Sequence, residues 1–134
     1  MAGMARGEES PGHRLPRGWR ITRGMEIRSL MQRGKRSRTA HLDVFFFTSP
    51  VPHPRAGVVV PKHRQTAVKR NRLKRQIREI IRTEVVPRLT GAQVHTDILV
   101  RARREAYDAA FGMLRDELVA WADRNLRWQS SSYT

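Results

Sequence analysis

The 134-residue sequence contains no cysteine, and this absence excludes several classes of protein. A disulfide framework, a zinc finger or zinc knuckle, and a cysteine nucleophile all need a thiol that the chain lacks. Long apolar runs are also missing. No stretch approaches the ~20 apolar residues of a membrane-spanning helix, and the N-terminus has no apolar segment of a secretory signal. We therefore expect a soluble, cytoplasmic protein.

Acidic residues are scarce, with 12 Asp and Glu against 27 Lys and Arg. A protein that cuts RNA by itself uses clustered carboxylates to hold metal ions, or a paired general acid and base, and the scattered acids here offer neither. The histidines lack the spacing of metal ligands. They are His13, His41, His53, His63 and His95. We expect no catalytic residue and no metal site in the chain.

The basic residues that are present dominate the composition. A formal net charge of +15 gives a folded surface a strong positive potential, which favours a polyanionic partner. Nucleic acid is the leading candidate, and a membrane is not expected.

The length fits one domain with tails. Residues 1–18 mix Gly, Pro, Arg and Glu with few large apolar side chains, so they are predicted to form a disordered basic leader. Residues 19–126 are predicted to form a single RNA-binding domain. Residues 127–134 are predicted to be a flexible tail.

In the first half of the chain, apolar spacing predicts a short helix over residues 21–31 that ends at Gly34. The basic residues 33–38 are assigned to the turn after it, where flexible arginines meet phosphate. The aromatic run in residues 41–48 predicts a buried strand. The β-branched run in residues 56–60 predicts a second strand, antiparallel to the first.

In the second half, a long helix is predicted to begin near Thr66 and to end at Pro87. Residues 93–101 predict a third strand, and an amphipathic helix follows from Arg104. The apolar stripe of that last helix consists of Tyr107, Phe111, Leu114, Leu118 and Trp121. The resulting fold class is α+β, with the order α-β-β-α-β-α and a small sheet of three to four strands packed by helices.

The long helix is the most informative segment. Residues 64–82 contain eight Lys or Arg and a single acid. Helical geometry separates an apolar face from a polar one. The apolar face holds Leu73, Ile77, Ile80 and Ile81, and the polar face holds Asn71, Lys74, Arg75, Arg78 and Arg82. A solvated face usually interleaves Glu with Lys, whereas like charges stacked this way repel unless a polyanion neutralises them. The pattern therefore favours nucleic-acid binding over a bland charged surface.

These residues carry a resemblance to a known family. Residues 67–78, AVKRNRLKRQIR, resemble the signature helix of the bacterial ribonuclease P protein component, in which an Arg-Asn pair is followed by a Lys-Arg pair and a further Arg. Residues 55–62, RAGVVVPK, resemble the strand before that helix, and residues 97–101, DILVR, the strand after it. The resemblance extends from about Arg20 to Arg124.

The resemblance implies a ribosomal-protein-like fold with a left-handed βαβ crossover. It also implies a cofactor role: the RNA subunit cleaves precursor tRNA with Mg²⁺, and the protein, which binds no cofactor alone, binds that RNA and the 5′ leader. The implied RNA-binding residues are Lys62, Lys69, Arg70, Asn71, Arg72, Lys74, Arg75, Arg78, Arg82 and Arg101. The implied leader cleft is lined by Ile27, Leu30, Met31, Val44 and Phe46, or by the neighbours Phe45 and Phe47 in place of the last two.

The sequence departs from the family pattern in three places. The family usually has a serine before the lysine where this chain has Pro61 and Lys62. The family commonly has an aromatic residue in the first helix where this chain has Ile27, which packs but offers no ring for stacking. The family also usually has a glycine in the turn where this chain has Arg64 and Gln65, and the shape of that loop stays open.

Two other hypotheses remain. A ribosomal-type structural RNA-binding protein without a role in cleavage shares the size, basicity and fold class. A DNA-binding protein would need a dimer or a helix-turn-helix, and no such pattern precedes Thr66. DNA is therefore not expected as a partner.

Overall fold

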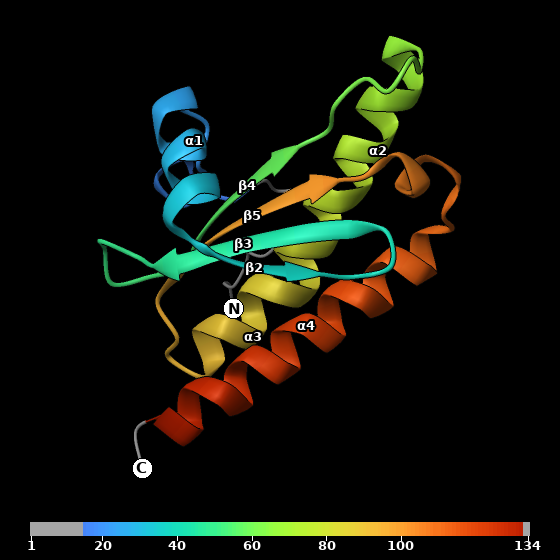
Figure 1. The fold of residues 1–134 in the computed structure, drawn as a ribbon. Coiled ribbons are helices and arrows are strands. Elements are labelled where there is room, and N and C mark those ends of the chain that lie inside the picture. The colour runs from blue at the N-terminus through green and yellow to red at the C-terminus, as the bar shows by residue number, and fades with distance from the viewer. Residues whose placement is uncertain (1–14, 133–134) are drawn as a thin grey trace, which may run out of the picture.

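A four-stranded sheet organises the chain, in the order β2-β3-β5-β4 (Figure 1). The computed structural model describes residues 15–132, and the side chains of residues 15–126. The strands are β2 Lys35–Arg38, β3 Leu42–Thr48, β4 Arg55–Val59 and β5 Thr96–Ala102. Strand β3 runs antiparallel to both β2 and β5, while β4 and β5 are parallel neighbours.

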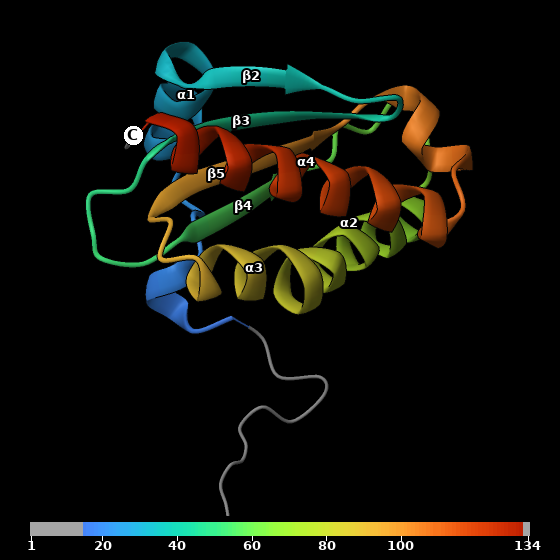
Figure 2. The ribbon, with the colours of Figure 1, turned by 90° about the horizontal axis from the view of Figure 1, so that it is seen from below.

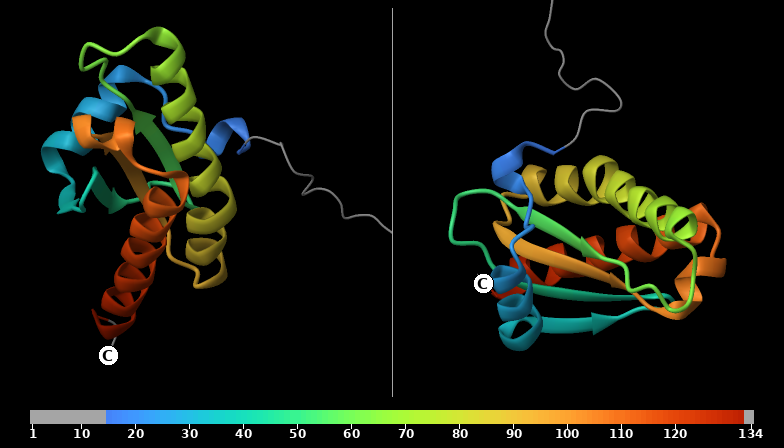
Figure 3. Two further views of the ribbon diagram at one scale, coloured as in Figure 1. Left: turned by 90° about the vertical axis from the view of Figure 1, so that its right-hand side faces the viewer. Right: turned by 90° about the horizontal axis from the view of Figure 1, so that it is seen from above.

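Helices cover the sheet unequally. Helices α2 (Ala67–Ile80), α3 (Val86–Gly91) and α4 (Phe111–Ser132) lie on one face, and the short α1 (Gly24–Arg33) lies on the other (Figures 2 and 3). The larger core joins the three helices to the sheet and includes Val44, Ile77, Ile98 and Leu118. A smaller cluster under α1 joins Ile21, Leu30, Phe45 and Leu99. The α+β class and the four-stranded sheet agree with the sequence prediction.

The first two predicted strands, β3 and β4, are neighbours in sequence but not in the sheet. Strands β3 and β4 run in opposite directions, as expected, yet β5 lies between them. Strands β4 and β5 are connected through α2 and α3, which gives the βαβ unit that the resemblance implies. The left-handed sense of this crossover stays a prediction.

Strand β2 corrects the assignment of residues 33–38 to a turn. Residues Lys35–Arg38 pair with Phe46 to Asp43 of β3 and form the outer edge of the sheet. This strand has no apolar residue, so no hydrophobic alternation marks it. Charged side chains are common on edge strands, because they discourage pairing with a further strand.

The long helix begins as predicted but does not end at Pro87. The side-chain oxygen of Thr66 accepts a hydrogen bond from the Lys69 amide at 3.2 Å, which caps α2. Residues Ile81–Val85 then form a π-helical turn, and Pro87 falls in the first turn of α3. A proline is tolerated there because the missing amide hydrogen has no partner within the helix.

The last helical segment begins later than predicted. Residues Arg104–Asp108 form a 3₁₀ turn, and α4 starts only at Phe111. Phe111 is 40% exposed, so it is not part of the core stripe, whereas Leu114, Leu118 and Trp121 are buried. Helix α4 continues to Ser132, which places residues 127–132 in a helix rather than in a tail.

The predicted leader lies mostly outside the described residues, which exclude 1–14 and 133–134. Its last residues belong to the domain. Residues Arg17–Trp19 form a 3₁₀ turn, Leu15 packs against the larger core, and the Trp19 ring stacks on His53 at 4.3 Å between centroids. The ordered domain therefore starts before residue 19.

Candidate nucleic-acid interface

Helix α2 presents a basic face to the outside of the molecule. We use this name for Asn71, Arg72, Lys74, Arg75 and Arg78, which are all exposed except the half-buried Lys74. The buried side of the same helix holds Leu73, Ile77 and Ile80. Within residues 15–132, no carboxylate pairs with any arginine of the basic face. Like charges are thus gathered without internal neutralisation, as the sequence predicts.

The electrostatic strain of this face is visible at Lys74. Burial lowers the pKa of the Lys74 ammonium, and the positive charges of Arg78 and Arg70 lower it further. A polyanion that neutralises these arginines would reverse their contribution. Phosphate bound beside these arginines would therefore raise the pKa of Lys74 and favour its charged form.

Within the helical segment 67–85, two of the residues assigned to RNA binding already have partners within the protein. The Nε of Arg70 donates to the Val60 carbonyl at 2.6 Å, which ties α2 to the end of β4. Arg82, in the π-helical turn after α2, forms an ion pair with Glu79 of α2 at 2.6 Å. Both are less available to phosphate than Arg72, Arg75 and Arg78.

The loop before α2 holds Lys62 exposed at the carboxyl end of β4. The Tyr107 hydroxyl donates to the Pro61 carbonyl at 2.7 Å and anchors this loop. His63 and Arg64 have positive φ angles of 46° and 64°. Arg64 thus adopts the left-handed backbone that suits glycine, in the turn where the family usually has one. Lys69 is exposed in the first turn of α2, close to the same loop.

A second surface lies on the face of the sheet that carries α1, which we call the α1 face. Phe45 and Leu99 form its centre, packed against Leu30. Ile27 and Met31 of α1 are half-buried against this cluster, as the cleft prediction requires. We find them beside the sheet, at the position where the resemblance places the leader.

Val44 and Phe46, the two strand residues preferred for the cleft, lie on the opposite face. Val44 is fully buried in the larger core, and Phe46 packs edge-to-face against Trp121 with ring centroids 5.4 Å apart. Side chains alternate along a strand, so the α1 face takes Phe45 and Phe47 instead. The alternative pair is the one that the structure places there.

Arginines surround the two phenylalanines of the α1 face. The guanidinium carbons of Arg36 and Arg101 lie 5.8 Å and 5.2 Å from the centre of the Phe45 ring. Arg33 lies 5.7 Å from the centre of the Phe47 ring. Phe45 is 5% exposed, whereas Phe47 is 48% exposed and offers its ring to a ligand. Exposed aromatic rings next to cations are typical of surfaces that bind single-stranded nucleic acid.

A buried carboxylate holds the arginines of this surface in place. The side chain of Asp43 is 1% exposed and forms ion pairs with Arg36, Arg101 and Arg103 at 3.2–3.3 Å. Burial alone would raise the pKa of Asp43, but the hydrogen bond from Arg101, together with those positive charges, keeps it below its ordinary value. Asp43 therefore stays ionised and orients Arg101 between Phe45 and Met31.

The other end of the α1 face is closed by a polar network. Arg55 donates two hydrogen bonds to the Asp97 carboxylate, at 2.9 and 2.7 Å, and a third to Glu26 of α1 at 3.3 Å. The hydrogen bonds to Asp97 and its negative charge raise the pKa of Arg55 despite burial. This network fixes α1 against β4 and β5.

Sequence reasoning missed part of this surface. Arg33, Arg36 and Arg103 were not assigned to it, and Arg101 lies here rather than beside the basic face. Residue parity along β3 gives the missing signal: Leu42, Val44 and Phe46 are all apolar, whereas the alternate set includes Asp43. The mixed set is the one that lies on the α1 face.

Within residues 15–132, no group of three or more His, Asp or Glu is placed to hold a metal ion. No helix in this range is both long and apolar enough to cross a bilayer.

Comparison with known proteins identifies the family. The Ribonuclease P family model matches residues 15–125. The chain belongs to the ribonuclease P protein family. The ribonuclease P protein component of Acidothermus cellulolyticus is 35% identical over 114 residues, which cover 84% of this chain and 88% of that protein. That of Syntrophobacter fumaroxidans is 46% identical over 87 residues, or 65% of this chain and 71% of that protein.

Solved ribonuclease P proteins share the fold. The protein from Thermotoga maritima superposes with a TM-score of 0.65 at 26% identity, covering 78% of this chain and 96% of that one. The Staphylococcus aureus protein superposes with a TM-score of 0.63 at 25% identity, covering 75% of this chain and 88% of that one. The ribonuclease P family match begins at residue 15, which is also the first residue that the structure describes. The basic face and the α1 face both lie inside the matched range, and the family is the protein part of an endoribonuclease that processes tRNA.

Proposed function

We propose that this chain binds the ribonuclease P RNA subunit through the basic face and the 5′ leader of precursor tRNA through the α1 face. The observation that carries the proposal is the presence of two separate cationic surfaces of different chemistry. The basic face offers unpaired arginines suited to the phosphates of a folded RNA. The α1 face adds an exposed ring, which suits an unstacked single strand.

The two surfaces approach each other at one end of the sheet. The first turns of α2 project beyond the carboxyl ends of β4 and β5 (Figure 1). Lys62 follows β4 at that end, and Arg101 is paired in register with Val59 of β4. The RNA subunit on the basic face and the single-stranded leader on the α1 face would therefore be neighbours. Promotion of leader removal follows from this placement, because holding the leader beside the RNA subunit lowers the entropy cost of aligning the scissile bond.

The chemistry itself is assigned to the RNA subunit and its Mg²⁺ ions. The carboxylates of the α1 face are occupied by arginines: Asp43 by three of them and Asp97 by Arg55. The chain therefore contributes binding and charge neutralisation rather than a general base or a metal ligand. It acts as a cofactor of the ribonucleoprotein.

Cleavage of a precursor tRNA by a bacterial ribonuclease P RNA at low magnesium tests this proposal. Adding the protein is expected to increase the rate, since its cations replace part of the charge neutralisation that Mg²⁺ otherwise supplies. If the protein binds RNA but gives no gain with any ribonuclease P RNA, including that of its own source, the ribosomal-type alternative is favoured.

Phe47 provides a separate test of the α1 face. Replacing Phe47 by Ala is expected to weaken binding of precursor tRNA with a leader about tenfold, because base–aromatic stacking contributes about 1–3 kcal/mol. Binding of mature tRNA and of the RNA subunit should be unchanged. The comparison uses equilibrium binding of the two tRNA forms to the assembled ribonucleoprotein.

Phe111→Ala is the matched control, because Phe111 is a similarly exposed ring at 40% but belongs to α4. Equal losses from the two variants, or an equal loss with mature tRNA, would contradict leader binding at Phe47.

A further inference from the structure

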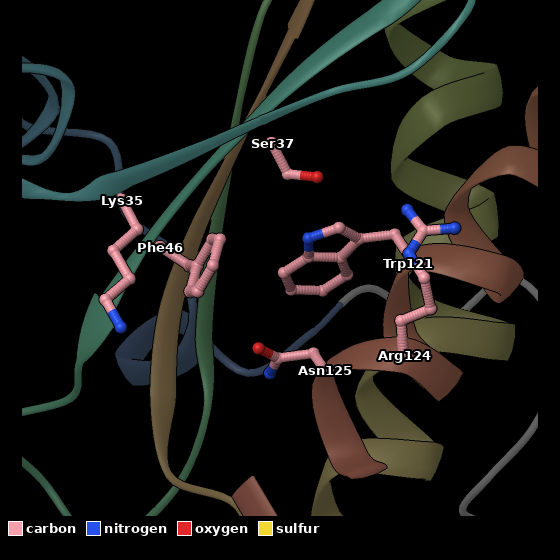
Figure 4. A pocket seen from close by; sticks show the side chains of 6 residues that line it. All are labelled: Lys35, Ser37, Phe46, Trp121, Arg124 and Asn125. Atoms are coloured by element: carbon pink, nitrogen blue, oxygen red, sulfur yellow. The ribbon is translucent and has the colours of Figure 1, made fainter. Parts of the chain in front are cut away.

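A hollow of about 260 Å³ lies between the edge strand β2 and helix α4, on the face of the sheet opposite α1 (Figure 4). It is separate from both surfaces described above. Six side chains line it: Lys35, Ser37, Phe46, Trp121, Arg124 and Asn125. Pockets that bind drug-sized ligands measure roughly 300–1,000 Å³, so this smaller hollow suits a group about as large as one nucleobase.

An unsatisfied polar group points to a ligand at this site. Asn125 is 6% exposed, and its buried side-chain nitrogen has no hydrogen-bond partner among residues 15–126, whose side chains the structure describes. Figure 4 shows the Asn125 amide directed from α4 toward the strand side of the hollow. Buried donors are nearly always paired, because burial removes their hydrogen bond to water and leaving the donor unpaired costs free energy. An acceptor atom of a ligand would supply the missing partner.

The rest of the lining combines aromatic rings with cations. Phe46 and Trp121 pack at 5.4 Å with an interplanar angle of 68° and form an apolar floor. Arg124 and Lys35 are exposed at the rim, one from α4 and one from β2. Ser37 adds a hydroxyl from the edge strand. An amide, aromatic edges and rim cations together match the base and the phosphate of a nucleotide.

We propose that this hollow binds one unpaired nucleotide of RNA, with its base hydrogen-bonded to the Asn125 amide and its phosphate held by Arg124. An apolar peptide side chain would leave the buried amide unpaired, and a free phosphate would leave the aromatic floor uncovered. The inference rests on the proposed function only in taking RNA as the polymer that supplies the nucleotide. The site gives the protein a third RNA contact, on the side of the sheet away from the α1 face.

Titration of the ¹⁵N-labelled full chain with each of the four nucleoside 5′-monophosphates tests the site. The indole N–H signal of Trp121, identified by its loss in Trp121→Phe, is expected to shift saturably with at least one of them. Asn125→Leu keeps the side-chain size and removes both the hydrogen-bond donor and the acceptor of the amide, so it should weaken that binding at least tenfold. Its melting temperature should be no lower than that of the parent, because the Asn125 nitrogen makes no internal hydrogen bond.

Arg124→Gln and Arg104→Gln form a matched pair, since each removes one exposed positive charge. Only Arg124→Gln should weaken binding. If Asn125→Leu does not fold, Asn125→Asp replaces the donor by an acceptor at constant size and should weaken binding similarly.

The inference is overturned if the Trp121 signal does not shift with any monophosphate, or if the shift survives in the Asn125 variants. The cleavage assay separates this result from the proposed function. If the protein increases the cleavage rate but the Trp121 signal does not shift with any monophosphate, only the third RNA-binding site is ruled out. If the Trp121 signal shifts but the cleavage rate does not increase, only the role in ribonuclease P is ruled out.

Discussion

Replacing Arg72, Arg75 and Arg78 together by alanine is expected to lower the affinity for ribonuclease P RNA by about 1,000-fold. No carboxylate within residues 15–132 pairs with these exposed guanidiniums, so each is available for a charge-assisted hydrogen bond worth about 1.5–3 kcal/mol, or at least about tenfold in affinity. The plot of log affinity against log salt should also become shallower by about 0.7–0.9 for each phosphate that is no longer neutralised. Filter binding across a salt series measures both quantities.

Arg82→Ala is the matched control, because Arg82 lies in the π-helical turn that directly continues α2. Its guanidinium is already paired with Glu79 at 2.6 Å, so its removal should cost much less affinity than Arg75→Ala. Arg70→Ala should differ from both, because loss of its bond to the Val60 carbonyl lowers stability as well as binding. If Arg82→Ala and Arg75→Ala weaken binding equally, the unpaired arginines are not the RNA-binding surface.

The basic face could be predicted because its signal is local. Helical periodicity places Leu73 and Ile77 inward and Arg75 and Arg78 outward, and no distant residue is needed to decide this. Thr66 likewise marks the helix start through its own side chain and the next turn. The structure adds which arginines have partners within the protein: Arg70 bonds to Val60, and Arg82 pairs with Glu79. These contacts depend on rotamers that the sequence does not specify.

The errors arise where a distant contact decides the local structure. Strand β2 forms because β3 offers an open edge, and its own Lys-Arg-Ser-Arg sequence carries no apolar pattern. Strand β4 pairs with β5 although β3 is nearer in sequence. Pro87 is accommodated because the π turn over Ile81–Val85 ends before it and Pro87 falls in the first turn of α3. In each case, tertiary packing overrides the local preference of the sequence.

The face of β3 was the main ambiguity of the candidate site. Three consecutive phenylalanines put rings on both sides of the strand, so aromaticity alone does not identify the outward face. The position of Asp43 does. A carboxylate flanked by buried apolar residues needs cations, and Arg36, Arg101 and Arg103 supply them on the side that Phe45 and Phe47 share. Because of these ion pairs, substitution of Asp43 is expected to cost much of the stability of the fold.

Asp43→Asn is expected to lower the free energy of unfolding by about 3 kcal/mol, near the lower end of the cost of breaking a buried ion pair. The expected cost is at the lower end because the Arg36 side chain is half exposed and can turn to solvent when its partner is lost. A cost remains because the Arg103 side chain is only 15% exposed and cannot do so. Arg103 also donates to the carbonyls of Thr39 and Leu42, so the β2–β3 turn should loosen. Urea denaturation gives the stability, with Asp116→Asn, 78% exposed, as the control of similar chemistry.

The pH dependence separates the lost charge from a simple packing defect. The folded-state pKa of Asp43 lies below its unfolded value, so its carboxylate stabilises the fold above that unfolded value, about 3.9, and this contribution is lost as the pH falls through the folded pKa. The parent should therefore lose more stability than Asp43→Asn between about pH 5 and about pH 3. Parallel stability curves for the two proteins over that range would show that the Asp43 charge does not hold the arginines of the α1 face.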